Sequence, residues 1–351
     1  MRSSNVKKVL LSVFLFLCML AVVLTSSFYL YYHTEMMYYR DGNLRKSLAG
    51  TIDCLVVGAS FAMSGIEPKT LDEAMHVHSY NLSGMLVPMY ARTMLAEKEL
   101  ARNPVKTVVI EVAFDAMIKN SADDHNQGDE PVIARLDSLS ERIQYMKANL
   151  SFQECVNVFS RSLIRCLQCW YNLATGSGGV DYEARGFVGV DPIDLTIPED
   201  EVAAYYHAQT FTLDTYREEN IEQLKELVAI CRKYGAEPVI INMINSDHDN
   251  WETDQLALYH DWIAAFAQEQ GCRFYDFNLI KARYDLFNDA DCFCDINHLS
   301  TDSARVFSKL MGEVLLRAEE GIDVSDEFYE SFDAMMEDSP YTKLYREQAA
   351  E

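Results

Sequence analysis

The sequence is short of basic residues. Its 351 residues include 30 Lys and Arg against 54 Asp and Glu, which gives a formal net charge of −24 at pH 7. Binding to nucleic acid phosphates needs clustered Lys and Arg, so this balance argues against a nucleic acid partner. It argues less strongly against an anionic polymer, because a cleft in an acidic protein can be locally neutral. The chain also has no internal repeat.

The nine cysteines lack the spacing of a disulfide framework or of a zinc site. Cys166 and Cys169 form one Cys-x-x-Cys pair in a segment of helical pattern, and no second pair follows at zinc-site spacing. We therefore predict neither a metal nor a cofactor. Cys292 and Cys294 could be bridged, but the sequence does not indicate to which partner. Five histidines without ligand-like neighbours are interpreted as surface or core residues: His76, His78, His207, His248 and His260.

The amino terminus has no charged residue from Val9 to Tyr32. At about 1.5 Å per residue this run spans roughly 36 Å, which is enough for a tilted membrane helix. Three basic residues precede it, which predicts a cytoplasmic amino terminus and an extracytoplasmic remainder; they are Arg2, Lys7 and Lys8. Four aromatic residues close the run like an interfacial belt, namely Phe28, Tyr29, Tyr31 and Tyr32.

A cleaved signal peptide is the alternative interpretation of this run. The run is long for a signal peptide, no Ala-x-Ala type of site follows it, and the residues before Cys18 are too bulky for a lipoprotein signal. We therefore expect a single-pass anchor in the cell membrane over residues 9–32, between a cytoplasmic tip at 1–8 and a stalk at 33–50.

Strand-like and helix-like segments alternate from residue 51 onward. The apolar runs of strand length are 54–57, 77–81, 107–112, 238–243 and 273–276. Such alternation predicts an α/β domain, with a parallel sheet built from right-handed crossovers and covered by helices on both faces. We expect this domain to occupy residues 51–318.

The alternation is interrupted between about 119 and 211, where the pattern is first helical and then irregular. We interpret this segment as an insertion in the α/β domain. Two interpretations stay open: the insertion covers an active site, or it is a surface elaboration that does not reach the cleft. Residues 319–351 are rich in acids and are expected to form a C-terminal tail, partly helical or disordered.

A candidate nucleophile follows the first strand. Gly58 ends the apolar run, and Ser60 comes two residues later, at the carboxyl edge of the sheet where open α/β folds bind their ligands. An unassisted alcohol is a poor nucleophile near neutral pH, so this serine needs a base. Asp295 lies three residues before His298, in a loop before a helix, and can orient that imidazole. A lone serine here is more often a helix cap, and a lone loop histidine is more often structural, so the combination carries the hypothesis.

Three blocks, in this order, resemble the SGNH or GDSL-type hydrolase superfamily. They are Gly58-Ala59-Ser60 after the first strand, Asn81-Leu82-Ser83-Gly84 after the second, and Asp295-x-x-His298 before the last helix. The resemblance covers about Thr51 to Arg317. The phrase Ser-Tyr-Asn-Leu-Ser (79–83), with the anchor, most resembles the membrane-tethered branch. That branch includes the D-alanyl transfer protein of teichoic-acid alanylation and the O-acetylation proteins of exported polysaccharides.

The resemblance implies a three-layer, flavodoxin-like SGNH hydrolase fold and a serine acyl esterase or acyltransferase of the O-acetyl or D-alanyl type. Ser60 would attack an ester or thioester carbonyl, His298 would move the proton, and Asp295 would fix the imidazole tautomer. The backbone N–H of Ser60 and an N–H near Gly84 would bind the oxyanion.

Two positions depart from the family pattern. Ala59 stands where the first block has Asp, and Phe114 stands where the third block has an oxyanion-donating Asn. Losing one such donor costs about 100- to 1000-fold in rate. Either Asn81 or Asn242 replaces it, or the chain is slow or inactive on simple esters.

Three functions therefore stay open. The first is a membrane-anchored, extracytoplasmic acyl esterase or acyltransferase that acts on a cell-envelope polymer or exported glycan carrying acyl esters. Its expected partner, a membrane-bound O-acyltransferase, is implied by the resemblance alone. The second is a catalytically silent binding or scaffold subunit of such a system, which Ala59 and Phe114 favour. The third is a phospholipid or lipoprotein esterase that uses the same residues.

Overall fold

The computed structural model describes residues 2–34, 44–118, 125–175, 184–205, 218–247, 256–288 and 290–350. The chain divides into two compact units. The smaller unit combines Met1–Lys46 with Ile133–Tyr182, and the larger unit combines Ser47–Val132 with Glu183–Glu351. The segment expected as an insertion, 119–211, therefore contributes to both units.

The larger unit is built on a five-stranded parallel sheet. Its strands are β1 (Cys54–Val57), β2 (Ser79–Asn81), β3 (Thr107–Glu111), β4 (Glu237–Asn242) and β5 (Arg273–Asp276). Neighbouring strands all pair in parallel, in the order β2-β1-β3-β4-β5. This order is that of flavodoxin-like doubly wound sheets, in which the winding direction changes between β1 and β3. The predicted parallel α/β sheet is confirmed.

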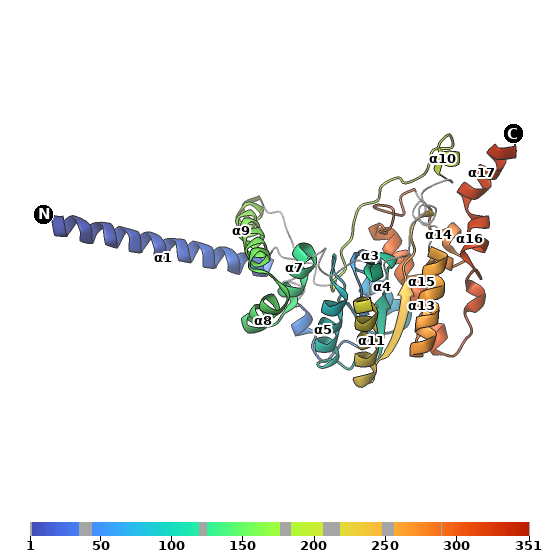
Figure 1. Ribbon diagram of the computed structural model, residues 1–351, viewed down its shortest axis with the longest axis horizontal. Helices are drawn as coiled ribbons and strands as arrows, with labels where there is room; N and C mark the ends of the chain where they lie inside the picture. The colour runs from blue at the N-terminus through green and yellow to red at the C-terminus, as the bar shows by residue number, and fades with distance from the viewer. Residues whose placement is uncertain are drawn as a thin grey trace. The chain divides into compact units, whose positions relative to one another are not determined.

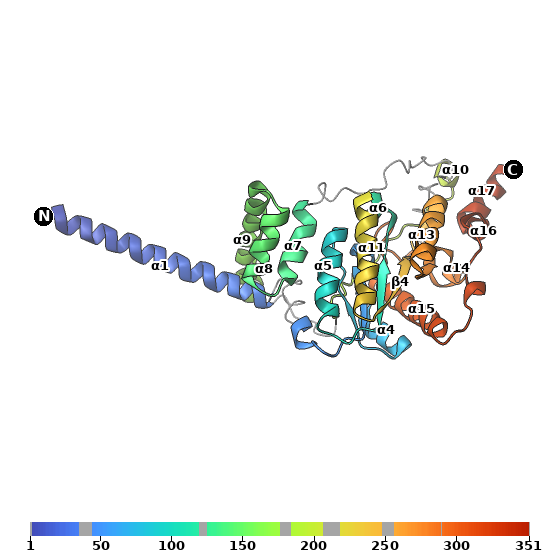
Figure 2. The ribbon, with the colours of Figure 1, turned by 60° about the horizontal axis from the view of Figure 1, so that its bottom comes forward.

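Helices cover both faces of this sheet (Figures 1 and 2). On one face α4 (Pro68–Met75) packs against α15 (Thr301–Glu319), and on the other α5 (Met89–Leu100) packs against α11 (Glu218–Lys233). The close approach of α4 and α15 depends on Gly312, since a Cβ at this position would lie 2.6 Å from the Cβ of Ala74. A fifth helix, α13 (Leu256–Gln270), packs beside β5.

The strands read as apolar runs because both faces of the sheet are covered. Every residue of β1 and β3 is buried. One core cluster joins alternate strand residues to the facing sides of α4 and α15; it includes Cys54, Val56, Val109, Val239, Ile241, Leu71, Met75, Phe307, Met311 and Val314. Other helices in the described residues include α3 (Ser60–Gly65), α6 (Phe114–Ile118), α7 (His125–Arg135), α10 (Val202–Tyr205) and α14 (Arg283–Leu286).

The acidic segment after Glu319 packs onto the larger unit. It forms α16 (Phe332–Asp338) and α17 (Pro340–Ala350), which bury Met335 and Tyr341. Asp247 links this segment to α14, because it accepts hydrogen bonds from Arg283 Nη2 at 2.8 Å and from the Ser339 hydroxyl at 2.6 Å. The described part of this segment is therefore largely helical.

The smaller unit contains α1 (Arg2–Thr34), α8 (Leu139–Asn149) and α9 (Phe152–Thr175). Within α1, Val6–Ser27 is long and apolar enough to cross a membrane, by length and composition. The expected anchor at 9–32 overlaps this span. The aromatic side chains expected to close the run, and half of the expected stalk, lie outside the described residues.

Candidate active site

The turn between β1 and α3 presents Ser60 at the point where the sheet changes its winding direction. Ala59 N donates a hydrogen bond to Glu111 Oε2 at 2.7 Å, and Glu111 is fully buried at the end of β3. A Cβ on Gly58 would lie 2.5 Å from the same oxygen, so glycine is needed where the carboxylate approaches the turn. Glu111 therefore fixes the backbone that carries Ser60. Sequence reasoning missed it, although an acidic residue ending a buried strand was a visible signal.

The structure brings Ser60, His298 and Asp295 together. His298 Nε2 lies 2.8 Å from the Ser60 hydroxyl, and His298 Nδ1 lies 2.8 and 2.9 Å from the two carboxylate oxygens of Asp295. Phe61 stacks on the imidazole, with ring centroids 4.8 Å apart and planes 23° apart. The imidazole is therefore held from both ring nitrogens and from one face.

The charge of Asp295 determines which ring nitrogen of His298 can accept a proton. Partial burial raises the pKa of Asp295, but the hydrogen bond and charge of His298, with the N–H groups of Asn297 and His298, outweigh it and lower the pKa below its ordinary range. Asp295 is then a carboxylate at neutral pH, so it accepts the proton of Nδ1–H. Nε2 is left as the acceptor that faces Ser60.

The loop that carries His298 is fixed by its own backbone and by the loop after β4. Cys294 N donates to the carbonyl of His298 at 2.8 Å, and Phe293 forms an antiparallel bridge with Leu299. The Ser246 hydroxyl donates to the carbonyl of Ile296 at 2.6 Å. These contacts place the imidazole without help from a regular element.

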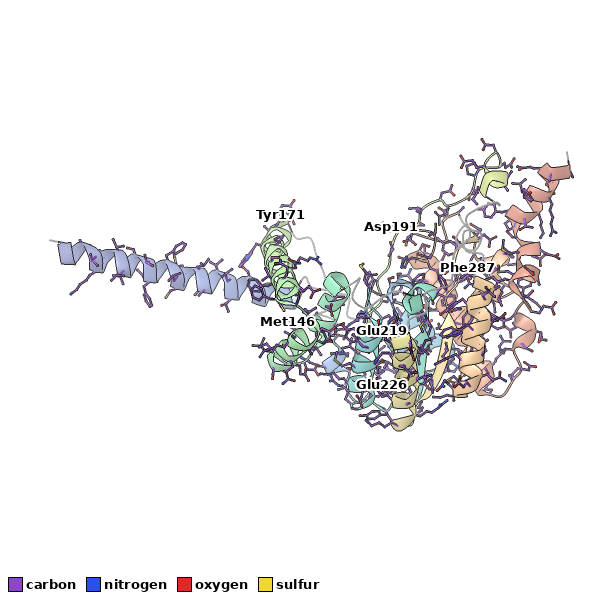
Figure 3. All side chains as sticks on the ribbon, in the orientation of Figure 1. Met146, Tyr171, Asp191, Glu219, Glu226 and Phe287 are labelled. Carbon is purple, nitrogen blue, oxygen red and sulfur yellow. The ribbon has the colours of Figure 1, made fainter. Side chains whose placement is uncertain are left out.

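Residues 184–193 connect α3 to the His298 loop; Asp191 in Figure 3 marks this segment. Val188 N donates to the carbonyl of Met63 in α3 at 3.0 Å. Ile193 N donates to the carbonyl of Phe293 at 2.8 Å, beside the loop that carries the histidine. The irregular part of the expected insertion therefore contacts the two segments that carry Ser60 and His298, and a role of the insertion as a cover of the site stays a prediction.

The two backbone N–H groups expected to bind the oxyanion are those of Ser60 and Gly84. Among the residues that the structure describes, neither Ser60 N nor Gly84 N donates to a protein acceptor. Gly84 is buried, and the segment before it is tied to α3 and β1, since Leu82 N donates to the carbonyl of Val56 at 2.8 Å. Gly84 thus remains a candidate oxyanion donor.

Asn81 and Asn242, the two side chains expected as possible oxyanion donors, use their amide groups for other hydrogen bonds. Asn81 Nδ2 donates to the carbonyls of Ala62 at 2.7 Å and Ile66 at 2.8 Å, so both of its amide protons stabilise the end of α3. Asn242 Nδ2 donates to Asp276 Oδ2 at 3.2 Å, and its strand lies two positions from β1, roughly 10 Å away. Neither side chain replaces the donor that is missing at Phe114. The Phe114 ring itself packs edge-on against Tyr259 at 5.4 Å.

A second His–Asp pair lies at the end of β5. His260 Nδ1 is 2.9 Å from Asp276 Oδ2, and Asn278 N donates to Asp276 Oδ1 at 3.1 Å. A pocket of about 700 Å³ adjoins this pair, and none of Ser60, Asp295 and His298 lines it. The sequence analysis found no carboxylate partner for His260, because the packing of α13 on β5 brings His260 and Asp276 together. Within the described ranges, no group of three or more His, Cys, Asp and Glu is placed to hold a metal ion.

His260 is expected to make stability depend on pH. Burial lowers the pKa of His260, but the hydrogen bond and charge of Asp276, with the charge of Asp261, outweigh it and raise the pKa above its ordinary value. The protonated ring therefore contributes stability that is fully present below a pH of about 6.5 and is lost as the pH rises through the folded-state pKa. His260→Gln is expected to lower the free energy of unfolding most at acidic pH. Urea unfolding of both proteins across this range measures the difference, and parallel pH curves would contradict the expectation.

Neither a family model nor a curated protein matches the chain. Among solved structures, an acetyl xylan esterase from the rumen bacterium Butyrivibrio proteoclasticus is similar to it, with a TM-score of 0.32 and 9% sequence identity. The match covers 78% of this chain and 65% of that structure, so the chain spans less than two thirds of its length. At this level of similarity the function has to be argued from the site itself.

Proposed function

We propose that the larger unit is a serine acyl esterase or acyltransferase of the SGNH type. Ser60 is the nucleophile, His298 is the general base and then the general acid, and Asp295 orients the imidazole. The observation that carries this proposal is the 2.8 Å contact between His298 Nε2 and the Ser60 hydroxyl, with Asp295 bound to the other ring nitrogen. A serine, a base and a group that orients the base are the parts that an activated alcohol requires.

The reaction proceeds through an acyl-enzyme. The Ser60 oxygen bonds to the ester carbonyl carbon while its proton passes to His298 Nε2, and the oxyanion accepts hydrogen bonds from the N–H groups of Ser60 and Gly84. The carbon–oxygen bond to the leaving alcohol then breaks, and His298 gives its proton to that alcohol. Water or a sugar hydroxyl next bonds to the acyl carbon and passes its proton to His298. The bond from that carbon to the Ser60 oxygen then breaks, and His298 returns the proton to Ser60.

The openness of the site favours an acyl group carried on a large substrate. The side chain of His298 is 22% exposed and that of Asp295 is 51% exposed, so the site is not enclosed. A shallow site can admit a short acyl branch while the polymer that carries it stays in solvent. We therefore take a cell-envelope polymer or an exported polysaccharide with ester-linked acyl groups as the substrate class.

Membrane anchoring through α1 completes the proposal. The Val6–Ser27 span and the basic residues before it support a single-pass protein whose residues after the span are extracytoplasmic. A membrane-bound O-acyltransferase is the partner proposed to supply or share the acyl group.

A catalytically silent scaffold of the same fold is the second candidate. Phe114 favours it, because its ring offers no donor and neither Asn81 nor Asn242 takes its place. Such a subunit would hold a glycan or the membrane partner without forming an acyl-enzyme.

A fluorophosphonate probe separates the two candidates. The full chain in detergent is expected to take up one probe molecule on Ser60, because the probe reacts only with an activated serine. Ser60→Ala is expected to abolish labelling, whereas Ser303→Ala, which removes a hydroxyl in α15, is expected to retain it. Absent labelling, or labelling that survives in Ser60→Ala, would favour the silent scaffold.

A further inference from the structure

One face of α9 is apolar and open to solvent. Phe152, Val156, Phe159 and Trp170 recur at the spacing of a single helix face and are 85%, 41%, 60% and 45% exposed. These four residues form the α9 stripe. Tyr171, labelled in Figure 3, borders the stripe and is 69% exposed. Exposed aromatic residues in a row mark an interaction surface rather than ordinary scatter.

The opposite face of α9 is polar. It carries Glu154, Asn157 and Arg161, at the spacing expected for a helix with one apolar and one polar side. A helix with this division of faces suits a boundary between an apolar and an aqueous phase.

The α9 stripe is tied to the end of the apolar span. Trp170 Nε1 donates a hydrogen bond to the Ser27 hydroxyl at 2.7 Å, and Ser27 is the last residue of Val6–Ser27. α9 also packs against α1, and it lies across α1 rather than along it (Figures 1 and 2). A helix held across the end of a membrane span stands at the depth of the lipid headgroups, where tryptophan is enriched.

The formal charges of the two units differ in the direction expected if α9 lies at a membrane surface. Beyond the apolar run, residues 33–46 and 133–182 hold 8 Lys and Arg against 6 Asp and Glu, a formal charge of +2. The larger unit holds 19 Lys and Arg against 48 Asp and Glu, a formal charge of −29. An anionic membrane surface therefore repels the larger unit and not the part of the smaller unit that contains α9.

We propose that α9 is an in-plane helix whose stripe binds the membrane–water interface. The inference rests on the proposed membrane anchor in α1. Lipid is the occupant that the Ser27 contact favours, because a helix fixed at this depth meets the acyl-chain boundary before it meets any protein. Binding at two places, through α1 and through α9, holds the smaller unit in one orientation to the membrane surface.

Fluorescence quenching by brominated lipid tests this position. The full chain carrying Trp251→Phe and Trp262→Phe keeps Trp170 as its single tryptophan, and it is reconstituted in vesicles of phosphatidylcholine and phosphatidylglycerol. Trp170 is expected to be quenched strongly by lipid brominated near the headgroup and less by lipid brominated near the chain ends. The matched protein, with Trp170→Phe and Trp251→Phe, keeps Trp262 in the larger unit and is expected to show no quenching.

Two further variants separate the α9 stripe from a general effect of charge. Phe159→Glu is expected to abolish most of the quenching of Trp170, whereas Asn157→Glu adds the same charge on the polar face and is expected to leave it intact. Equal effects of the two substitutions would overturn the proposal.

Alkaline carbonate extraction separates failure of the anchor from failure of this proposal. Release of the chain by carbonate would mean that α1 does not span the membrane, and the in-plane position would fall with it. Retention of the chain with an unquenched Trp170 would overturn the lipid contact alone, and would indicate that another protein covers the stripe.

Discussion

Ser60→Ala and His298→Ala are each expected to lower kcat for ester hydrolysis by about 10⁴-fold or more. The serine hydroxyl forms the bond to the acyl group, and the imidazole nitrogen that receives its proton lies 2.8 Å away. Each residue therefore needs the other for this step. The double variant is therefore expected to be no slower than either single variant, because groups that act as a unit are not additive.

The substitution of Ser60 is also expected to leave the fold intact. Ala59 is the N-cap of α3, and within the described part of the chain the Ser60 hydroxyl contacts only His298, so removing it exposes no other buried polar group. Steady-state kinetics on short acyl esters, with Tm measured on the same samples, checks both statements. Turnover that is unchanged in both single variants would exclude these residues from the mechanism.

Asp295→Asn is expected to reduce kcat by about 10⁴-fold, close to the effect of removing the base itself. The carboxylate accepts the proton of His298 Nδ1–H at 2.8 Å, which leaves Nε2 free to accept the serine proton. An asparagine amide can donate to Nδ1 instead. The ring proton then lies on Nε2, where it faces Ser60 and blocks the proton transfer.

Asp291→Asn is the matched control for this change. Asp291 is an exposed residue of the same loop, and it has a φ of 63°, a conformation that asparagine also tolerates. This variant loses the same charge four residues earlier and is expected to keep nearly full activity. Equal activity of the Asp295→Asn and Asp291→Asn proteins would show that the tautomer is not set by Asp295.

The strands and the pairing of Ser60 with His298 could be predicted because both correspond to short, recognisable stretches of sequence. Buried parallel strands are runs of apolar residues, and Ser60 follows the first of them after a glycine. In a parallel sheet, the end of a strand places its residues at the edge where ligands bind. The predicted proximity of Ser60, Asp295 and His298 needed only that rule and the resemblance of three short blocks.

The asparagine predictions failed for a tertiary reason. Asn81 and Asn242 both end strands, at the edge of the sheet where an oxyanion donor is expected, and nothing local distinguishes them. The amide of Asn81 is committed to two carbonyls of α3, and the amide of Asn242 to Asp276 on the neighbouring strand. Those partners depend on the packing of α3 and on strand order, which a single sequence does not encode locally.

The bracing of the site by residues 184–193 could not be predicted either. Its contacts to α3 and to the His298 loop join backbone N–H and carbonyl groups, and the types of the side chains do not predict such contacts. Glu111 was visible as an acidic residue at the end of a buried strand, but its role depends on the turn after the adjacent strand β1, where Gly58 leaves room for the carboxylate.

The hydrogen bonds that Asp295 accepts have a consequence for the surroundings of the enzyme. A polyanion concentrates protons as it does other cations, so the layer beside an anionic envelope polymer is more acidic than bulk solution. A carboxylate with an ordinary pKa begins to lose its charge in such a layer. The pKa of Asp295 is held below its ordinary range by its hydrogen bonds, so we expect Asp295 to stay ionised in such a layer and to keep the imidazole oriented if the proposed polymer is the substrate.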